Sequence, residues 1–241
     1  MSDSKLQFWD KLLPNQEPYK CEFTGPDDGY MEALFKIIMK SSQIEMPEDR
    51  FTLIQSEKFT IPEMGSNPVS LRFLEMLTRL VRAENVLEIG SFIGVSAMNF
   101  AEALPANGKV VTFEKFDHFA DICRQNFKSN NLQDKIQLIV GDAFDSLDQI
   151  PDGMMFDLIF IDGNKERYLD YFEKLEHLLR PGGLILVDDC FFHGDAINEP
   201  PEGEKGAGCR AFLDEAAKRG NYYRLALPIS NGIYLMMKPL V

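Results

Sequence analysis

Short apolar segments alternate with helical segments between residues 85 and 188, and this alternation constrains the fold more than any other feature of the chain. A strand that returns to the same sheet through a helix pairs in parallel with its predecessor, and helices then cover both faces of the sheet. The sequence therefore predicts an α/β fold with a parallel sheet. The predicted strands are 85–90, 109–114, 135–141, 156–162 and 184–188, and the helices between them are 95–104, 117–129 and 166–179.

Further elements are predicted on either side of this core. Apolar residues at helical spacing predict helices over 29–42, 67–82 and 211–219. Two final strands, 222–229 and 233–237, are joined by Ser230-Asn231-Gly232, and Asn-Gly between apolar segments predicts a tight antiparallel hairpin. The segment Arg180-Pro181-Gly182-Gly183 predicts a break between a helix and the strand after it.

The composition is typical of a globular protein in a reducing compartment. Of the 241 residues 45% are hydrophobic, and the net charge of −13 disfavours binding to nucleic acids. No segment approaches the roughly 20 apolar residues that span a bilayer, and the N-terminus lacks the apolar stretch of a signal peptide. The cysteines have no metal-binding spacing: Cys21, Cys123, Cys190 and Cys209. We expect a cytoplasmic protein with no membrane partner. We also expect two parts of the chain, a helical or irregular extension over 1–60 and a main domain over 61–241.

Acidic side chains stand at the ends of all the predicted parallel strands, where ligands of such sheets bind. Because these strand ends meet at one edge, we expect a group of carboxylates around one cleft: Glu88, Glu114, Asp142, Asp162, Asp188 and Asp189. Each of them could instead cap the helix that follows, and for Asp142 this alternative is as good as ligand binding. The set as a whole favours a ligand site.

The turn after the first strand, from Glu88 to Gly94, opens a helix but lacks the G-x-G-x-x-G spacing of dinucleotide-binding proteins. Glu114 is placed to accept both hydroxyls of a ribose, and a ribose without a pyrophosphate favours S-adenosylmethionine (SAM) over NAD. Ser96 and the backbone N–H groups of the first helical turn are suited to the carboxylate of the methionine part. Taken alone, Ser96 fits an ordinary helix-start residue better.

The ends of the fourth and fifth strands carry Asp162, Asp188 and Asp189, which are hard oxygen donors of the kind that Mg²⁺ or Ca²⁺ prefers. Lys165 follows Asp162 closely enough to take a proton beside a metal-bound oxygen. A solvated lysine paired with a carboxylate is the alternative. His193 follows the same strand, and it is a weaker candidate for a place near the site.

Four segments together resemble the cation-dependent class I O-methyltransferases, a family that includes caffeoyl-CoA and catechol O-methyltransferases and bacterial relatives. They are VLEIGSFIGVS, GDAFDSLDQI, FDLIFIDGNKERYLDYFEKLEHLLRPGGLILVDD and NGIYLMMK, and the resemblance runs from about Met64 to the C-terminus. It implies a Rossmann-like seven-stranded sheet whose last strand is antiparallel. It also implies a SAM site, a divalent cation (usually Mg²⁺, with Ca²⁺ or Mn²⁺ as alternatives) and commonly a homodimer.

The resemblance also implies individual roles. Lys165 matches the lysine general base and acts beside Asp162, which with Asp188 matches two metal ligands. The family usually has Asn as the third ligand, where this chain has Asp189, and its frequent D-A-D-K is here Asp162-Gly163-Asn164-Lys165. The positions that match SAM contacts are Met64, Glu88, Gly90, Phe92, Ser96, Glu114, Gly141, Asp142, Ala143 and Asp162.

The expected function is methyl transfer from SAM to a hydroxyl of a small catechol-like or phenolic acceptor, assisted by a divalent cation. Three alternatives stay open. A tRNA hydroxyuridine O-methyltransferase is disfavoured by the net charge, and an NAD-dependent oxidoreductase by the glycine spacing. Asp189 and Asn164 depart from the pattern of the family, and the third alternative is therefore a SAM- or metal-binding protein without catalysis. Residues 191–208, which carry Gly and Pro, are expected to form a loop beside the acceptor.

Overall fold

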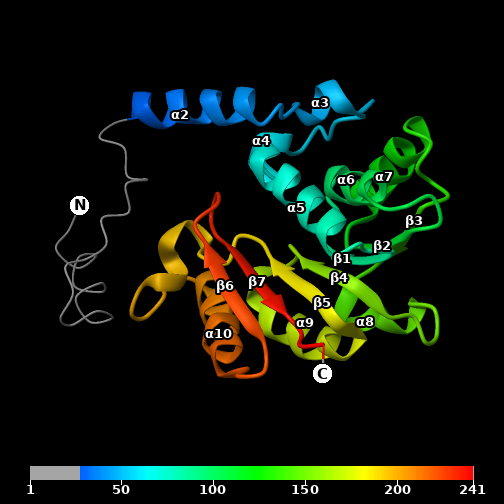
Figure 1. Ribbon diagram of the computed structural model, residues 1–241. Helices are drawn as coiled ribbons and strands as arrows, with labels where there is room; N and C mark the ends of the chain where they lie inside the picture. Colours follow the sequence, from blue (N-terminus) through cyan, green and yellow to red (C-terminus); the bar gives the residue numbers. More distant parts are fainter. Residues whose placement is uncertain (1–27, 241) are drawn as a thin grey trace. The chain divides into compact units, whose positions relative to one another are not determined.

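The structure, a computed structural model, describes residues 28–240 of the chain (Figure 1). The chain divides into two compact units, Met1–Gln43 and Ile44–Val241. In the first unit, α2 (Asp28–Ser41) confirms the helix predicted over 29–42. The rest of the predicted extension, residues 1–27, lies outside the described residues. No helix within residues 28–240 is long and apolar enough to cross a membrane.

The second unit is built on a seven-stranded sheet with the order β3-β2-β1-β4-β5-β7-β6. Strands β1 to β5 pair in parallel, whereas β7 is antiparallel to both of its neighbours. This confirms the predicted α/β fold, its antiparallel last strand and the closing hairpin. The strands are β1 (Asn85–Ile89), β2 (Lys109–Glu114), β3 (Ile136–Val140), β4 (Phe156–Ile161), β5 (Leu179–Val187), β6 (Tyr223–Leu227) and β7 (Ile233–Met237).

Helices lie on both faces of the sheet because the strands are apolar on both sides. Leu74, Phe100 and Phe127, from α5, α6 and α7, pack on one face, and Phe172 and Phe212, from α9 and α10, pack on the other. The α-helices of this unit are α3 (Pro47–Arg50), α4 (Ile61–Met64), α5 (Pro68–Leu80), α6 (Val95–Ala103), α7 (Asp117–Ser129), α8 (Ala143–Ser146), α9 (Tyr168–Leu175) and α10 (Glu204–Lys218). The 3₁₀ helices are η1 (Leu147–Gln149), η2 (Lys165–Arg167), η3 (Glu176–Leu178) and η4 (Phe192–Ile197).

The predicted break at Arg180-Pro181-Gly182-Gly183 is wrong, because these residues lie inside β5. Leu179 already pairs with Phe156, and the next paired residues are Leu184 and Leu158. The extra residues of β5 form an irregularity in the ladder, where a Pro and a glycine at φ +75° are tolerated. The preceding helical segment is confirmed as α9 with η2 and η3 at its ends.

Helix α10 begins at Glu204, well before the predicted start at residue 211, so residues 204–208 of the expected 191–208 loop are helical, and η4 occupies residues 192–197. The glycines of this first part serve close packing. A Cβ at Gly208 would lie 2.4 Å from the carbonyl oxygen of Lys165, and one at Gly206 would overlap the carboxylate of Asp195. Asp195 accepts hydrogen bonds from the backbone N–H of Glu202 (2.7 Å) and of Gly203 (3.0 Å), which fixes the entry to the helix.

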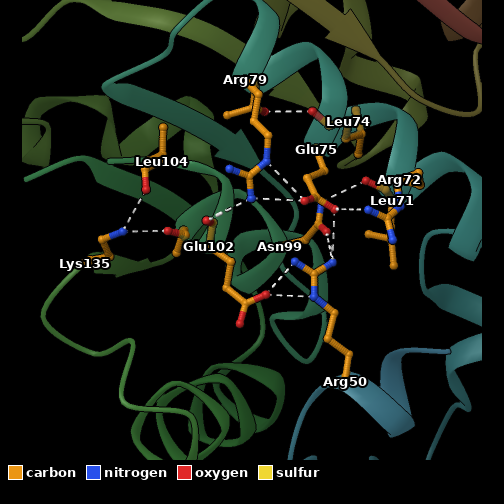
Figure 2. A network of polar contacts seen from close by, with 12 residues as sticks. Arg50, Leu71, Arg72, Leu74, Glu75, Arg79, Asn99, Glu102, Leu104 and Lys135 are labelled. Carbon is orange, nitrogen blue, oxygen red and sulfur yellow. Dashed lines mark hydrogen bonds and ion pairs between the residues drawn. The ribbon is translucent and has the colours of Figure 1, made fainter. Parts of the chain in front are cut away.

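Residues 44–60 belong to the second unit, so the observed division precedes the one predicted at residue 60. Figure 2 shows Arg50 reaching Glu102 (2.7 Å), Asn99 (2.7 Å) and Glu75 (3.5 Å). Further along, the side-chain amide of Asn126 accepts from the N–H of Ile54 at 2.6 Å and donates to its carbonyl at 3.2 Å. The Asn126 side chain thus satisfies the backbone N–H and carbonyl of Ile54, as a neighbouring strand would do in a sheet. These hydrogen bonds hold the extended segment against α6 and α7.

Candidate functional site

A cleft of about 840 Å³ opens at the carboxyl ends of the parallel strands. All but one of the predicted site residues line it, although they come from segments as far apart as α4 and the end of β5. These residues are Met64, Gly90, Phe92, Ser96, Glu114, Gly141, Asp142, Ala143, Asp162, Lys165, Asp188 and Asp189. The expectation that the strand-end carboxylates surround one cleft is therefore confirmed, with Glu88 as the exception.

The turn between β1 and α6 requires glycine at position 90. Gly90 has φ +96°, and a Cβ there would lie 2.4 Å from the carbonyl oxygen of Asp162. This close approach brings the end of β1 against the end of β4, whose Asp162 N–H donates to the Ile89 carbonyl at 2.8 Å. The first turn of α6, with the hydroxyl-bearing Ser96, faces the same cleft and offers backbone N–H groups to an anion.

Glu114, at the end of β2, is held in place by the backbone. Its Oε2 accepts from the N–H of Phe92 at 2.8 Å and its Oε1 from the N–H of Phe116 at 2.9 Å. Burial raises the pKa of Glu114, although these backbone hydrogen bonds oppose the shift. Each oxygen keeps a second lone pair, so this oriented carboxylate is able to accept two hydroxyl hydrogen bonds from a ligand in the cleft.

Glu88 lies beneath the cleft and does not line it, because it sits inside β1 with a fully buried side chain. Its Oε2 accepts from the Thr112 hydroxyl at 2.5 Å, and its Oε1 has no hydrogen-bond partner among the described residues. Burial raises the pKa of Glu88 to about 7, against the effect of the Ser96 and Thr112 hydroxyls. In this structure Glu88 is therefore buried and is not among the residues that line the cleft, whereas the predicted contact between Glu88 and SAM stays a prediction.

Asp142 acts as the helix cap that was one of its two predicted roles. Its Oδ1 accepts from the N–H of Phe144 at 3.0 Å, at the start of α8. Its Oδ2 lies 3.1 Å from Lys115 and 3.7 Å from Arg167. Burial raises the pKa of Asp142, but the Phe144 N–H and the nearby Lys115 outweigh it and lower the pKa overall. The carboxylate still faces the cleft, beside Gly141 and Ala143.

At the acidic end of the cleft, Lys165 connects two carboxylates. Its Nζ lies 2.9 Å from Asp162 Oδ1 and 3.5 Å from Asp189 Oδ2. Burial opposes the charge of this amine, but Asp162 and Asp189 outweigh it and hold the pKa of Lys165 well above its usual value. The predicted proximity of Lys165 to the carboxylates is confirmed, and in this structure it is an ion-paired ammonium.

Burial raises the pKa of both Asp188 and Asp189. Burial and the nearby Asp162 raise the pKa of Asp188 to about 7. Asp189 Oδ1 is buried with no hydrogen-bond partner among the described residues. The backbone of Asp189 is left-handed, at φ +56°, a conformation that Asp and Asn tolerate better than other side chains.

These residues fit a divalent cation by the chemistry of their donors, since they offer carboxylate oxygens, and the buried Oδ1 of Asp189 has no hydrogen-bond partner among the described residues. Their arrangement is less complete. Within residues 28–240, no three His, Cys, Asp or Glu side chains are grouped closely enough to hold a metal ion together. The Lys165 ammonium lies between Asp162 and Asp189 instead.

Comparisons with known proteins agree with this geometry. The model of the O-methyltransferase family matches residues 45–239. The chain belongs to this family. A catechol O-methyltransferase of Niastella koreensis is 34% identical over 154 residues, which are 63% of this chain and 70% of that protein. A probable caffeoyl-CoA O-methyltransferase of Dictyostelium discoideum is 28% identical over 204 residues, or 78% of this chain and 80% of that protein.

Solved structures of methyltransferases show the same fold. The O-methyltransferase of Bacillus cereus, determined in complex with SAH, superimposes with a TM-score of 0.69 at 27% identity, covering 97% of this chain and 100% of that one. An SAH-bound methyltransferase of Podospora anserina gives a TM-score of 0.75 at 22% identity, covering 88% of this chain and 96% of that one. The sheet order and the antiparallel last strand are thus those of SAM-dependent O-methyltransferases.

In this O-methyltransferase, sequence reasoning missed several residues of the cleft. Phe119 of α7 packs edge-on against Phe92 at 5.1 Å and Phe116 at 6.0 Å, which gives the cleft an aromatic wall. Ser230 and Asn231 line the cleft from the hairpin tip, although their sequence indicated only a turn. His193 also lines it, as the weaker prediction had it. An acidic pattern at strand ends contains no signal for these aromatic and loop positions.

Proposed function

We propose that this O-methyltransferase moves a methyl group from SAM to a hydroxyl of a small catechol-like or phenolic acceptor, with a divalent cation held by Asp162, Asp188 and Asp189. One observation carries the proposal. The ion-paired Lys165 and the three carboxylates share a single cleft with Glu114 and the Gly90 turn. A site for a nucleoside and a site for a chelated oxygen therefore adjoin each other.

Residues of the first two strand ends are suited to SAM. The Gly90 turn lies in the same cleft as Glu114, and the Glu114 carboxylate is oriented to accept ribose hydroxyls. The first turn of α6 offers N–H groups to the methionine carboxylate. When bound, SAM supplies an electrophilic methyl group on a sulfonium. The SAH complex of the Bacillus cereus relative supports this part of the proposal.

The residues that would hold the cation are Asp162, Asp188 and Asp189, and they fit by donor type. When bound, the cation supplies Lewis acidity, which lowers the pKa of an acceptor hydroxyl, and a template that orients it. Asp189 brings a full charge to a position where the resembled family usually has a neutral amide. We expect this charge to strengthen cation binding and to weaken the Lewis acidity that the cation retains.

Lys165 is the candidate base for the acceptor hydroxyl. An ammonium paired with two carboxylates has no lone pair to offer, so Lys165 accepts a proton only after those carboxylates engage another positive charge. This requirement supports a dependence on cations. The aromatic wall of Phe92, Phe116 and Phe119 is suited to exclude water and to position a flat acceptor.

The test is transfer of labelled methyl from SAM to a panel of catechols and monophenols, first with Mg²⁺ and then with a chelator. We expect transfer to the catechols that is lost with chelator and restored by excess Mg²⁺. Transfer that survives chelation contradicts the cation, and transfer to monophenols alone contradicts the chelating acceptor. SAM binding by calorimetry without any transfer contradicts the small phenolic acceptor, and tRNA carrying hydroxyuridine is then the next acceptor to assay.

A further inference from the structure

Tyr168, the first residue of α9, is a large polar side chain to which the proposed reaction gives no role. It is fully buried, and its ring lies edge-on to that of Phe212, with the ring centroids 6.4 Å apart. A buried phenol usually finds a hydrogen-bond partner, and the Tyr168 hydroxyl donates to the backbone carbonyl of Asp188 at 2.8 Å. A side chain at the start of α9 thus reaches the end of β5, where two of the candidate cation ligands lie.

This carbonyl belongs to the peptide group that joins Asp188 to Asp189. Among the described residues, no other group donates a hydrogen bond to it. The N–H of the same peptide group donates to Asp188 Oδ1 at 2.9 Å. The Tyr168 hydroxyl, the 188–189 peptide and the Asp188 carboxylate therefore form one chain of hydrogen bonds, in which each bond polarises the next.

The 188–189 peptide is held in an orientation that strains the backbone, because Asp189 has the left-handed φ of +56°. A half-turn of this peptide plane changes ψ of Asp188 and φ of Asp189, and it would bring the latter to about −124°, in the broad allowed β region. The turned peptide would carry its N–H away from Asp188 Oδ1 and its carbonyl away from the Tyr168 hydroxyl. The φ preference of Asp189 thus favours the turned peptide, and the hydrogen bond from Tyr168 opposes it.

We propose that Tyr168 is a positioning residue, whose hydroxyl holds the 188–189 peptide in the orientation that presents the Asp188 carboxylate to the cleft. The inference rests on the proposed function, since Asp188 is one of the candidate cation ligands. Tyr168 itself does not line the cleft, so it acts through this peptide and not on a ligand. A hydrogen bond behind a metal ligand orients that ligand before the metal binds, and its loss weakens metal affinity.

The ring of Tyr168 has a second neighbour, the candidate base. Lys165 Nζ lies 5.6 Å from the centroid of this ring, on the side of its ion pair with Asp162 at 2.9 Å. A phenylalanine offers Lys165 the same aromatic face. Tyr168→Phe therefore removes the hydrogen bond to the Asp188 carbonyl while it keeps the ring beside Lys165, and this makes it the variant that isolates the hydroxyl.

The first test is amide hydrogen exchange by NMR on the full chain without cation or SAM. It compares the Asp189 N–H with the Cys190 N–H, which donates to the Gly232 carbonyl at 3.0 Å. We expect Tyr168→Phe to speed exchange of the Asp189 amide at least about tenfold and to leave the Cys190 amide nearly unchanged. The matched control, Tyr222→Phe, removes a hydroxyl from another buried tyrosine of the same core and should change neither amide. Equal acceleration of both amides in Tyr168→Phe, or none, overturns the proposal.

The second test is Mn²⁺ binding by electron paramagnetic resonance, since Mn²⁺ prefers the same carboxylate donors as Mg²⁺. We expect Tyr168→Phe to raise the Kd for Mn²⁺ about tenfold or more, while an unchanged Kd for SAM by calorimetry shows that the variant is folded. A folded variant that binds Mn²⁺ as tightly as wild type overturns the proposal. A wild type that binds no Mn²⁺, together with the selective change in Asp189 exchange, contradicts the cation of the proposed function and supports the role of Tyr168.

Discussion

Replacing Glu88 by Gln should stabilise the protein at neutral and alkaline pH. The Glu88 side chain is fully buried in β1, one of its oxygens has no partner among the described residues, and its pKa rises from 4.5 to about 7, chiefly because of burial. The folded state therefore binds this proton more tightly than the unfolded state does. As the pH rises from about 4.5 to about 7, the carboxyl group costs stability, and above that window the cost is complete.

The magnitude follows from the two pKa values. A shift from 4.5 to about 7 corresponds to about 3 kcal/mol of unfolding free energy once the group is ionised in both states. A neutral amide carries no such cost. We expect Glu88→Gln and wild type to agree within about 1 kcal/mol near pH 4, because both side chains are then neutral. Near pH 8 the variant should be more stable by up to about 3 kcal/mol.

Urea unfolding followed by far-UV circular dichroism at a series of pH values measures the difference directly. The control is Glu173→Gln, which removes an exposed carboxylate from α9 and should change stability only slightly. A difference between Glu88→Gln and wild type that stays flat from pH 4 to pH 8 would refute the reasoning. It would mean that Glu88 ionises in the folded protein as easily as in the unfolded chain.

Three further predictions concern the cleft. Lys165→Ala should lower the rate of methyl transfer about 100-fold or more while SAM affinity by calorimetry stays nearly unchanged, and an unaltered rate would remove Lys165 from the mechanism. Asp189→Asn keeps a side chain that tolerates φ +56° but removes one charge, so the Mg²⁺ concentration for half-maximal rate should rise about tenfold; no change would argue against Asp189 as a ligand. Gly90→Ala forces a Cβ to within 2.4 Å of the Asp162 carbonyl oxygen and should lower the free energy of unfolding by at least about 2 kcal/mol. Gly153→Ala, at a similar φ of +73° with no atom within 4 Å, is its control, and equal losses in the two variants would show that the close contact is unimportant.

The sequence was sufficient for most of the sheet because buried parallel strands are short and apolar on both sides. Strands β2 and β7 and helix α7 have the predicted bounds. The errors at β5 and α10 share one cause, since in both places Pro or Gly indicated a break. A ladder irregularity absorbs Pro181 and Gly182, and close packing against Asp195 and Lys165 requires Gly206 and Gly208. Such contacts come from distant residues and leave no local pattern.

The candidate site was predictable to the extent that topology alone creates it. Strand ends that meet at one edge bring Glu114, Asp142, Asp162 and Asp188 together in any sheet of this order. Topology does not say which carboxylates are exposed in the cleft, and for this reason the burial of Glu88 was not predicted. Its side chain follows the alternation of β1 into the layer beneath α6, where only its burial and its pairing with Thr112 identify it.

The left-handed backbone at Asp189 limits what this position is able to become. A β-branched or bulky side chain at φ +56° is strained, whereas Asp and Asn differ there by one oxygen and one amide group. An exchange of Asp for Asn at this position therefore changes the charge of the site without a change in backbone conformation. In the proposed cation site, exchanging the charge of this one side chain would trade the tightness of cation binding against the acidity of the bound ion, while the backbone of the site keeps the same conformation.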